Sequence, residues 1–240
     1  MPFRASYRKN LSMTLLLLPN LLGDLPEHKA FLPISVDQAV ATIDGLIAES
    51  EKGGRRFLSR FQHAKKPHEI PIALLNKHNQ DYDFLLEPCV TGEIWGLVSD
   101  AGLPCVADPG ARLVARARQL GVQVEAFVGP SSILLALMLS GLSGQQFQFH
   151  GYLPKNYEQR DQVIGEMGRS LGTQIFIEAP HRNSATLEAL LKLLPDSTIL
   201  CVAWDLTLST QGVMTEKVAT WKRLPLPNIQ KKPTIFLIGG

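Results

Sequence analysis

The sequence predicts an α/β protein of two domains, with a mostly parallel sheet in the first domain and a mixed sheet in the second. Two observations lead to this fold class. Short apolar runs rich in β-forming residues alternate with helical patterns through the first half of the chain, as a parallel sheet with crossover helices requires. Near the C-terminus, expected strands at 198–203, 212–219 and 234–238 follow one another without a helix, which favours antiparallel pairing.

A chain of 240 residues with 45% hydrophobic content is long enough for one large core or two smaller ones. We place the domain boundary at Gly129-Pro130, which gives domains 13–128 and 129–240 and leaves 1–12 as a disordered extension. The cations Arg4, Arg8 and Lys9 before the apolar run 11–18 imitate a signal peptide, but Pro19-Asn20 replaces a cleavage site. A first buried strand at 14–18 is therefore the better interpretation. No apolar run reaches the ~18–20 residues needed to cross a bilayer.

In the first domain, the expected strands are 14–18, 46–49, 70–75, 94–99 and 122–127, and the expected helices are 36–43, 53–61, 82–90 and 109–120. The last of these helices is expected to begin with Asp108 as its N-cap and Pro109 at its first position, and to stop at Gly121. In the second domain, the expected helices are 131–140, 157–168 and 183–194, and the first two expected strands are 147–150 and 173–178. Gly141 is expected to end the helix 131–140.

Composition excludes several classes of function. The three cysteines, Cys89, Cys105 and Cys201, form no C-x-x-C pair, so we expect neither disulfides nor zinc, and a reducing cytoplasm fits best. The six histidines show no metal-ligand spacing, so we expect no metal site. The usual glycine-rich nucleotide cradles and the G-x-S-x-G elbow are also missing. A net charge of +2 is too weak to establish a nucleic-acid partner and is compatible with one.

The stretch 94–110 is the strongest candidate for a ligand loop. Asp100 stands where the strand 94–99 ends, and ligands of parallel α/β sheets bind beyond the carboxyl ends of strands. Gly102, which has no Cβ, lets the backbone approach a ligand closely. The alternative is a plain structural turn between a strand and a helix.

Two other strand ends carry polar groups. Gly129-Pro130-Ser131-Ser132 opens a helix whose free N–H groups and hydroxyls can hold a carboxylate or hydroxyl-bearing ligand, although an ordinary capped helix explains the same residues. His181 and Arg182 follow the strand that ends at Glu178, and local hydrogen bonding at a helix start is the alternative for them.

Lys52, Arg56, Arg60 and His63 are spaced to share one face of a helix, with Arg55 and other cations nearby. Like charges at i,i+4 repel by a few tenths of a kcal/mol per pair, so a row of them favours a polyanionic partner. A solvated helix face is the alternative. Few aromatic residues interleave with these cations, so base stacking is not evident there.

Taken together, six segments resemble the tetrapyrrole methylase superfamily, and within it the branch of 16S ribosomal RNA ribose 2'-O-methyltransferases. They are VSDAGLPCVADPG, VGPSSILLALMLSGL, FHGYLPK, LLLLPNLLGDL, IAESEKGGRRFL and IFIEAPHR. The resemblance covers nearly all of 14–240. It implies a two-domain α/β methyltransferase, commonly a homodimer, that binds S-adenosylmethionine in a cleft between its domains.

By position, the resemblance implies cofactor contacts from Leu22, Asp100, Leu103, Ser132, Ile133, Ile177, Ala203 and Thr234. Asp100 would face the cationic end of the cofactor. If the acceptor is a ribose hydroxyl, a carboxylate can take its proton, and Glu49, Asp100 and Glu178 are the candidates because all stand at expected strand ends. Lys52, Arg55, Arg56 and Arg60 would bind the RNA backbone, in ribosomal RNA or the 30S particle.

The sequence departs from the family in three places. The acidic-Asp-Thr-Arg segment reads Glu49-Ser50-Glu51-Lys52, the usual Arg-Glu-Leu-Thr reads Trp204-Asp205-Leu206-Thr207, and the longer members' C-terminal helical extension is not expected after Gly240. Methyl transfer to a cytidine ribose of 16S ribosomal RNA remains the leading hypothesis. A small-molecule acceptor such as a tetrapyrrole, or a non-catalytic RNA- or cofactor-binding relative, are the alternatives.

Overall fold

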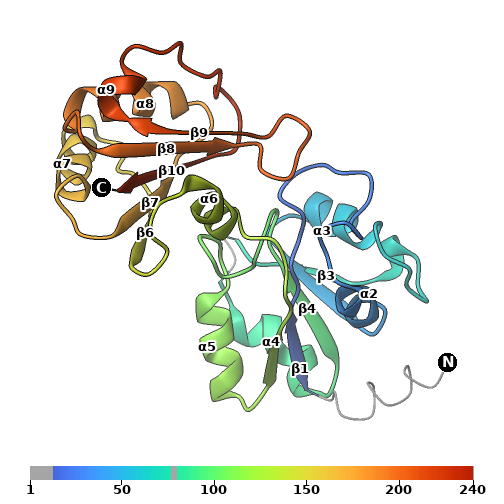
Figure 1. Ribbon diagram of the computed structural model, residues 1–240. Helices are drawn as coiled ribbons and strands as arrows, with labels where there is room; N and C mark the ends of the chain where they lie inside the picture. The colour runs from blue at the N-terminus through green and yellow to red at the C-terminus, as the bar shows by residue number, and fades with distance from the viewer. Residues whose placement is uncertain (1–12, 77–79, 240) are drawn as a thin grey trace. The chain divides into compact units, whose positions relative to one another are not determined.

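The computed structural model describes residues 13–76 and 80–239, so the extension expected at 1–12 lies outside the described residues. The chain divides into two compact units, which join in the sequence between Pro130 and Ser131 (Figure 1). Each unit contains its own five-stranded sheet.

The sheet of the first unit is entirely parallel, in the order β3-β2-β4-β1-β5. Its strands are β1 (Thr14–Leu17), β2 (Gly45–Ala48), β3 (Ile72–Leu74), β4 (Ile94–Val98) and β5 (Gln123–Ala126). Because all five run the same way, the loops that follow β1, β2 and β4 leave the sheet at one edge and from neighbouring positions. This is the arrangement that alternating strands and helices predict.

Helices cover both faces of this sheet. They are α2 (Ile34–Val40), α3 (Glu51–Leu58), α4 (Tyr82–Val90) and α5 (Ala111–Gln119), with a 3-10 turn η1 (Pro67–Glu69) after α3. Side chains of α2 and α3 pack in one cluster with Leu16, whereas those of α4 and α5 pack in another with Leu15. Successive residues of β1 thus serve opposite faces, as the pleat of a strand requires.

The sheet of the second unit is mixed, in the order β6-β7-β10-β8-β9. Its strands are β6 (Phe147–Tyr152), β7 (Thr173–Ile177), β8 (Ile199–Trp204), β9 (Gly212–Lys217) and β10 (Thr234–Gly239). Only β6 and β7 pair in parallel; β10 runs antiparallel to β7 and β8, and β9 antiparallel to β8. The parallel first sheet and the mixed second sheet confirm the predicted fold class.

Four helices belong to the second unit: α6 (Ser132–Ser140), α7 (Tyr157–Met167), α8 (Asn183–Leu193) and α9 (Val218–Trp221). Apolar side chains of α7, α8 and α9 form one core with the stacked rings of Phe176 and Phe236. Helix α6 lies against β8, β9 and β10. None of the helices in the described part of the chain is long and apolar enough to span a membrane.

Two local predictions are wrong. Helix α5 begins at Ala111 with Gly110 as its N-cap, so Asp108 and Pro109 remain in the preceding loop. The reason is that Gly110 has a φ of 137°, outside the helical range, and breaks any continuity with Pro109. The end of the expected strand 212–219 is instead the first turn of α9. Gly121 and Gly141, by contrast, follow α5 and α6 with φ of 75° and 72°, which confirms them as helix stops.

Candidate functional site

The carboxyl edge of the first sheet gathers the loops that the sequence singles out. Glu49 follows β2, Asp100 follows β4 and Asn20 follows β1, and these three strands are neighbours. The backbone N–H of Asp100 donates to Glu49 Oε1 at 3.1 Å. Glu49 and Asp100, two of the expected functional carboxylates, are therefore in direct contact.

Asn20 joins the loops after β1 and β4. Its Nδ2 donates to the carbonyl oxygens of Ser99 and Asp100, at 2.9 and 3.0 Å, and its Oδ1 accepts from the N–H of Leu21 at 2.9 Å. Its own backbone N–H donates to the carbonyl of Gly102 at 2.8 Å. Asn20 is buried, so each of these bonds satisfies a polar group that solvent does not reach freely.

The carboxylate of Asp100 lies over the first turn of α3. A Cβ built on Gly53 would come within 2.4 Å of Asp100 Oδ1, so a larger residue at this position would require the carboxylate to move. Ser50, the N-cap of α3, accepts from the N–H of Gly53 at 3.1 Å. The free N–H groups and the dipole at a helix N-terminus favour a negative charge at this place.

The electrostatics of this edge favour a positively charged ligand. Burial raises the pKa of Glu49. The hydrogen bond from the Asp100 N–H lowers this pKa, and the nearby charge of Asp100 raises it, so that the net shift is upward. Burial and the charges of Glu49 and Asp100 raise the pKa of Asp108 to about 6, while a hydrogen bond from Ser99 opposes the shift. A cationic group placed among these carboxylates would favour their ionised forms and be attracted by them.

The loop between β4 and α5 has an unusual backbone. Gly102 has a φ of 71°, and Cys105 and Ala107 occupy the same left-handed region although neither is glycine. A Cβ on Gly102 would lie 3.3 Å from the side chain of Leu22, so Leu22 borders the loop that carries Leu103. Non-glycine residues held with positive φ store strain of order 1–3 kcal/mol each and concentrate at functional sites.

The expected cofactor residues of the second unit also come together in part. Ile235 pairs with Ile177 of β7 on one side and with Ala203 of β8 on the other, and Thr234 is its chain neighbour. Ser132 and Ile133 form the first turn of α6, where the N-cap Ser131 accepts from the N–H of Leu134 at 3.4 Å.

The loop after β8 contains the second departure from the family pattern. Asp205 and Thr207 have positive φ of 51° and 73°. Asp205 Oδ2 pairs with Lys232 Nζ at 3.1 Å and accepts from the hydroxyl of Thr210 at 2.9 Å. These contacts tie the loop to the chain just before β10.

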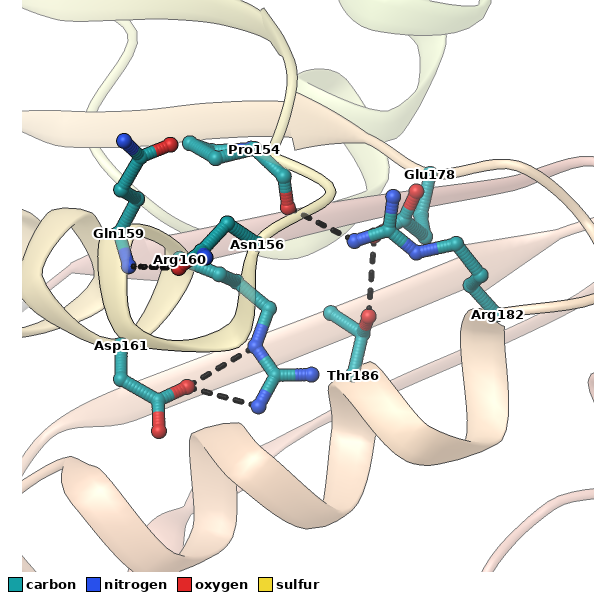
Figure 2. Close-up of polar contacts among 8 residues, drawn as sticks. All are labelled: Pro154, Asn156, Gln159, Arg160, Asp161, Glu178, Arg182 and Thr186. Carbon is teal, nitrogen blue, oxygen red and sulfur yellow. Dashed lines mark hydrogen bonds and ion pairs between the residues drawn. The ribbon is translucent and has the colours of Figure 1, made fainter.

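Glu178 lies at the end of β7 with its side chain only 1% exposed. Its Oε1 accepts from the N–H of Ala179 at 2.8 Å, and its Oε2 accepts from the hydroxyl of Thr186 and pairs with Arg182, both at 3.1 Å. Figure 2 shows that Arg182 also reaches the carbonyl of Pro154, at 2.9 Å. The carboxylate thus anchors the connection from β6 to α7 through Arg182.

The four expected RNA-binding cations differ in their surroundings. Lys52 and Arg56 are exposed. Arg55 donates to the carbonyls of Pro67 and Ile70 and so holds the segment after α3. Arg60 donates to Asn20 Oδ1 at 3.1 Å and its side chain is 12% exposed.

Sequence reasoning did not single out Asn20, Gly53 or Asp108 as parts of the carboxyl edge. Asn20 carried one weak signal, a polar residue directly after a buried strand and a proline. The contacts of Gly53 and Asp108 depend on strands and loops distant in sequence, and no local pattern carries them.

Comparison with known proteins identifies the family of the chain. The family model of the Tetrapyrrole (Corrin/Porphyrin) Methylases matches residues 35–221. Proteins named Ribosomal RNA small subunit methyltransferase I are similar along most of the chain. The one from Xylella fastidiosa is 32% identical over 83% of this chain and 69% of its own length, and the one from Vibrio cholerae is 30% identical over 91% and 73%.

Solved structures with the same fold include the methyltransferase CobJ, with a TM-score of 0.64 and 16% identity over 95% of this chain and 94% of CobJ. A uroporphyrin-III-C-methyltransferase from Thermus thermophilus has a TM-score of 0.57, also at 16% identity, over 94% of each chain. The family match, the relatives and the fold agree, and the chain belongs to the tetrapyrrole methylase family of S-adenosylmethionine-dependent methyltransferases.

Proposed function

We propose that this protein transfers a methyl group from S-adenosylmethionine to the 2'-hydroxyl of a cytidine ribose in 16S ribosomal RNA. The observation that carries the proposal is the similarity, at 32% identity over 83% of the chain, to a protein named Ribosomal RNA small subunit methyltransferase I. The exposed cations of α3, Lys52 and Arg56, support a polyanionic acceptor.

The residues of the first unit fit the proposed cofactor. Asp100 and Glu49 supply negative charge that suits a sulfonium or an ammonium group, and Gly102 has no Cβ, so its backbone can approach a ligand closely. S-adenosylmethionine, when bound, supplies a methyl group activated by its sulfonium. We assign its contacts to Leu22, Asp100, Leu103, Ser132, Ile133, Ile177, Ala203 and Thr234.

Holding donor and acceptor in line can supply roughly 7–11 kcal/mol of the barrier reduction, whereas a general base contributes ~10²–10⁴-fold. Among the candidates Glu49, Asp100 and Glu178, we assign the acceptance of the ribose proton to Glu49. Its pKa is raised toward the working pH and its carboxylate is half-buried, whereas the carboxylate of Glu178 is buried under three donors. Asp100 is then assigned to bind the cationic end of S-adenosylmethionine.

Lys52 and Arg56 are proposed to contact RNA phosphates directly, with Arg55 and Arg60 adding positive potential behind them. We also propose that the protein acts as a homodimer in the cytoplasm, on ribosomal RNA or the 30S particle. Light scattering coupled to gel filtration tests the dimer, which predicts twice the 26.4 kDa of the chain.

The deciding experiment incubates the purified protein with tritiated S-adenosylmethionine and 30S particles from cells that lack it. Mass spectrometry then maps ribose methylation in the 16S RNA. Label in one cytidine, lost in the Asp100→Asn variant, supports the proposal. Label only in an added tetrapyrrole supports the small-molecule alternative, and cofactor binding without transfer to either acceptor supports a non-catalytic relative. Both of the latter results refute the proposal.

A further inference from the structure

Arg60 occupies a different environment from the other cations near α3. It follows the C-cap of the helix, and its guanidinium points inward to donate to Asn20 Oδ1 at 3.1 Å. Burial and the charge of Arg56 lower its pKa, and the carboxylate of Asp24, itself 82% exposed, lies 3.9 Å away. Burying a guanidinium in this way is costly unless its hydrogen bonds are made.

The oxygen that Arg60 contacts belongs to Asn20, whose side chain holds the loop after β4. The amide nitrogen of Asn20 donates to the carbonyls of Ser99 and Asp100, and its amide oxygen accepts from the N–H of Leu21 and from Arg60. A flip of the Asn20 amide by about 180° would place its oxygen, in place of its NH₂ group, opposite the carbonyl oxygens of Ser99 and Asp100, so that two acceptors would face each other. Arg60 disfavours that rotation, because its cation would then face the amide nitrogen.

We propose that Asn20 and Arg60 are positioning residues for methyl-donor binding. Through Asn20, Arg60 holds the backbone at Ser99 and Asp100, and this keeps the Asp100 carboxylate over Gly53 at the first turn of α3. Arg60 thereby acts on the donor loop and not as a phosphate contact. The inference rests on the proposed function for the use of Asp100, and it adds two residues that are not among the expected cofactor contacts.

The two exposed cations provide the contrast. Arg56 lies one turn before Arg60, carries the same charge and is exposed. If both residues served only the RNA, their removal would have the same effect. If Arg60 acts through Asn20, removing it changes donor affinity, whereas removing Arg56 changes RNA affinity and its salt dependence.

The test measures the Kd for S-adenosylmethionine by calorimetry, without RNA, in Arg60→Met, Arg56→Met, Asn20→Ala and the double variant Asn20→Ala/Arg60→Met. We expect Arg60→Met and Asn20→Ala each to weaken binding by about tenfold, the order of one hydrogen bond to a charged group. Arg56→Met keeps the wild-type Kd. The Kd of the double variant rises by much less than the product of the two single increases, because both substitutions disrupt the same contact between Arg60, Asn20 and the loop after β4.

Arg60→Lys gives partial rescue, since lysine keeps the charge and one donor without the planar fork. If Arg60→Met does not fold, the comparison of Arg60→Lys with Arg56→Lys carries the test, with an expected weakening of about threefold for the first alone. Equal donor affinity in the Arg60 and Arg56 variants would overturn the inference. Methylation of 30S particles by the wild-type protein is measured separately. If the wild-type protein does not methylate them, the proposed RNA acceptor is wrong, and the comparison of S-adenosylmethionine Kd values still tests the role of Arg60.

Discussion

Two buried asparagines, Asn20 in the first unit and Asn183 in the second, each hold loops of their own unit. Asn20 fixes the loop after β4, and Asn183, at the start of α8, donates through Nδ2 to the carbonyls of Ile229 and Lys232 and to the hydroxyl of Thr234. Among the described residues, the Oδ1 of Asn183 has no hydrogen-bond partner. An amide supplies two donors on a short stem, so one residue can satisfy several backbone carbonyls that no strand pairs.

The Asp100 carboxylate lies where a Cβ of residue 53 would be, and we predict that Gly53→Ala impairs methyl transfer. The new Cβ would force Asp100 Oδ1 to move from a distance of 2.4 Å. Misplacement of about 1 Å costs on the order of a hundredfold, so we expect kcat/KM to fall by roughly ten- to a hundredfold. The free energy of unfolding changes little, because alanine favours the helix by up to about 1 kcal/mol.

Gly165→Ala in α7 is the matched control, since its Cβ would meet nothing closer than 3.8 Å. It should stabilise the fold slightly and leave kcat/KM unchanged. Equal activity of the two variants in the tritium-transfer assay would show that Asp100 is not held by this contact.

The raised pKa of Asp108 predicts how stability depends on pH. Its folded-state pKa of about 6 exceeds the ordinary 3.8, so the folded state binds more protons between pH 4 and pH 6. Stability therefore falls as the pH rises through that window. The Asp108→Asn variant has no carboxyl to ionise at this position, so its stability does not fall in this window. After allowance for partial exposure, we expect its free energy of unfolding at pH 7 to exceed that of the wild type by about 1 kcal/mol.

Urea unfolding of both proteins from pH 3.5 to pH 7.5 measures the difference, which should vanish near pH 4 because the carboxyl is then protonated in both states. A difference that does not change with pH would mean that Asp108 titrates as an ordinary exposed aspartate.

The residues that the sequence identifies and those that it misses differ in one physical respect. Asp100, Gly102 and Ser132 stand in local strand–loop–helix patterns, so their place at strand or helix ends follows from short windows of sequence. Asn20 contacts carbonyls about eighty positions away, and the Asp108 pKa depends on Glu49 across the sheet. Such contacts depend on strand order, which local patterns do not specify.

At the scale of elements, the ion pair of Glu178 with Arg182 helps to hold the connection from β6 to α7, because Arg182 also donates to the carbonyl of Pro154. Arg160, in the first turn of α7, is also buried and pairs with Asp161 Oδ1 at 2.7 Å (Figure 2). Its guanidinium carbon lies 5.0 Å from the centre of the Tyr157 ring. With Arg182 on Pro154 and Asn156 as the N-cap of α7, the segment is fixed at several points.

We predict that Glu178→Gln lowers the free energy of unfolding by about 3 kcal/mol, because it leaves the Arg182 guanidinium without its buried counter-charge. Amide hydrogen exchange should rise in the segment 153–157. Glu188→Gln on the exposed face of α8 is the control and should change neither quantity. If Glu178→Gln instead keeps its stability and loses kcat, Glu178 is a proton acceptor and our assignment to Glu49 is wrong.

Most elements follow from periodicity and their ends from glycine. Helices α4, α6 and α8 match runs of apolar residues, and Gly121 and Gly141 end helices because they accept a positive φ. The start of α5 was beyond such reasoning, since Asp108-Pro109 is a good helix opening by composition. The tertiary loop, with Cys105 and Ala107 in left-handed conformations, delays the helix to Ala111.

At the scale of the whole molecule, a net charge of +2 gives little overall attraction to RNA, so the proposed RNA binding depends on how the charges are distributed. Lys52 and Arg56 are exposed on α3, and Arg112 and Arg118 are exposed on α5, which covers the opposite face of the first sheet. The two pairs carry the same charge and lie on opposite faces of the first sheet.

We predict that Lys52→Ala/Arg56→Ala weakens binding to 16S RNA and lowers the magnitude of the slope of log K against log salt by about 1.4–1.8, since each lost phosphate contact removes roughly 0.7–0.9 from the slope. Arg112→Ala/Arg118→Ala makes the same change in net charge and should leave the slope near its wild-type value. Filter binding from 50 to 300 mM salt measures both. Equal loss in the two variants would mean that RNA responds to net charge alone, and that the α3 face is an ordinary solvated surface.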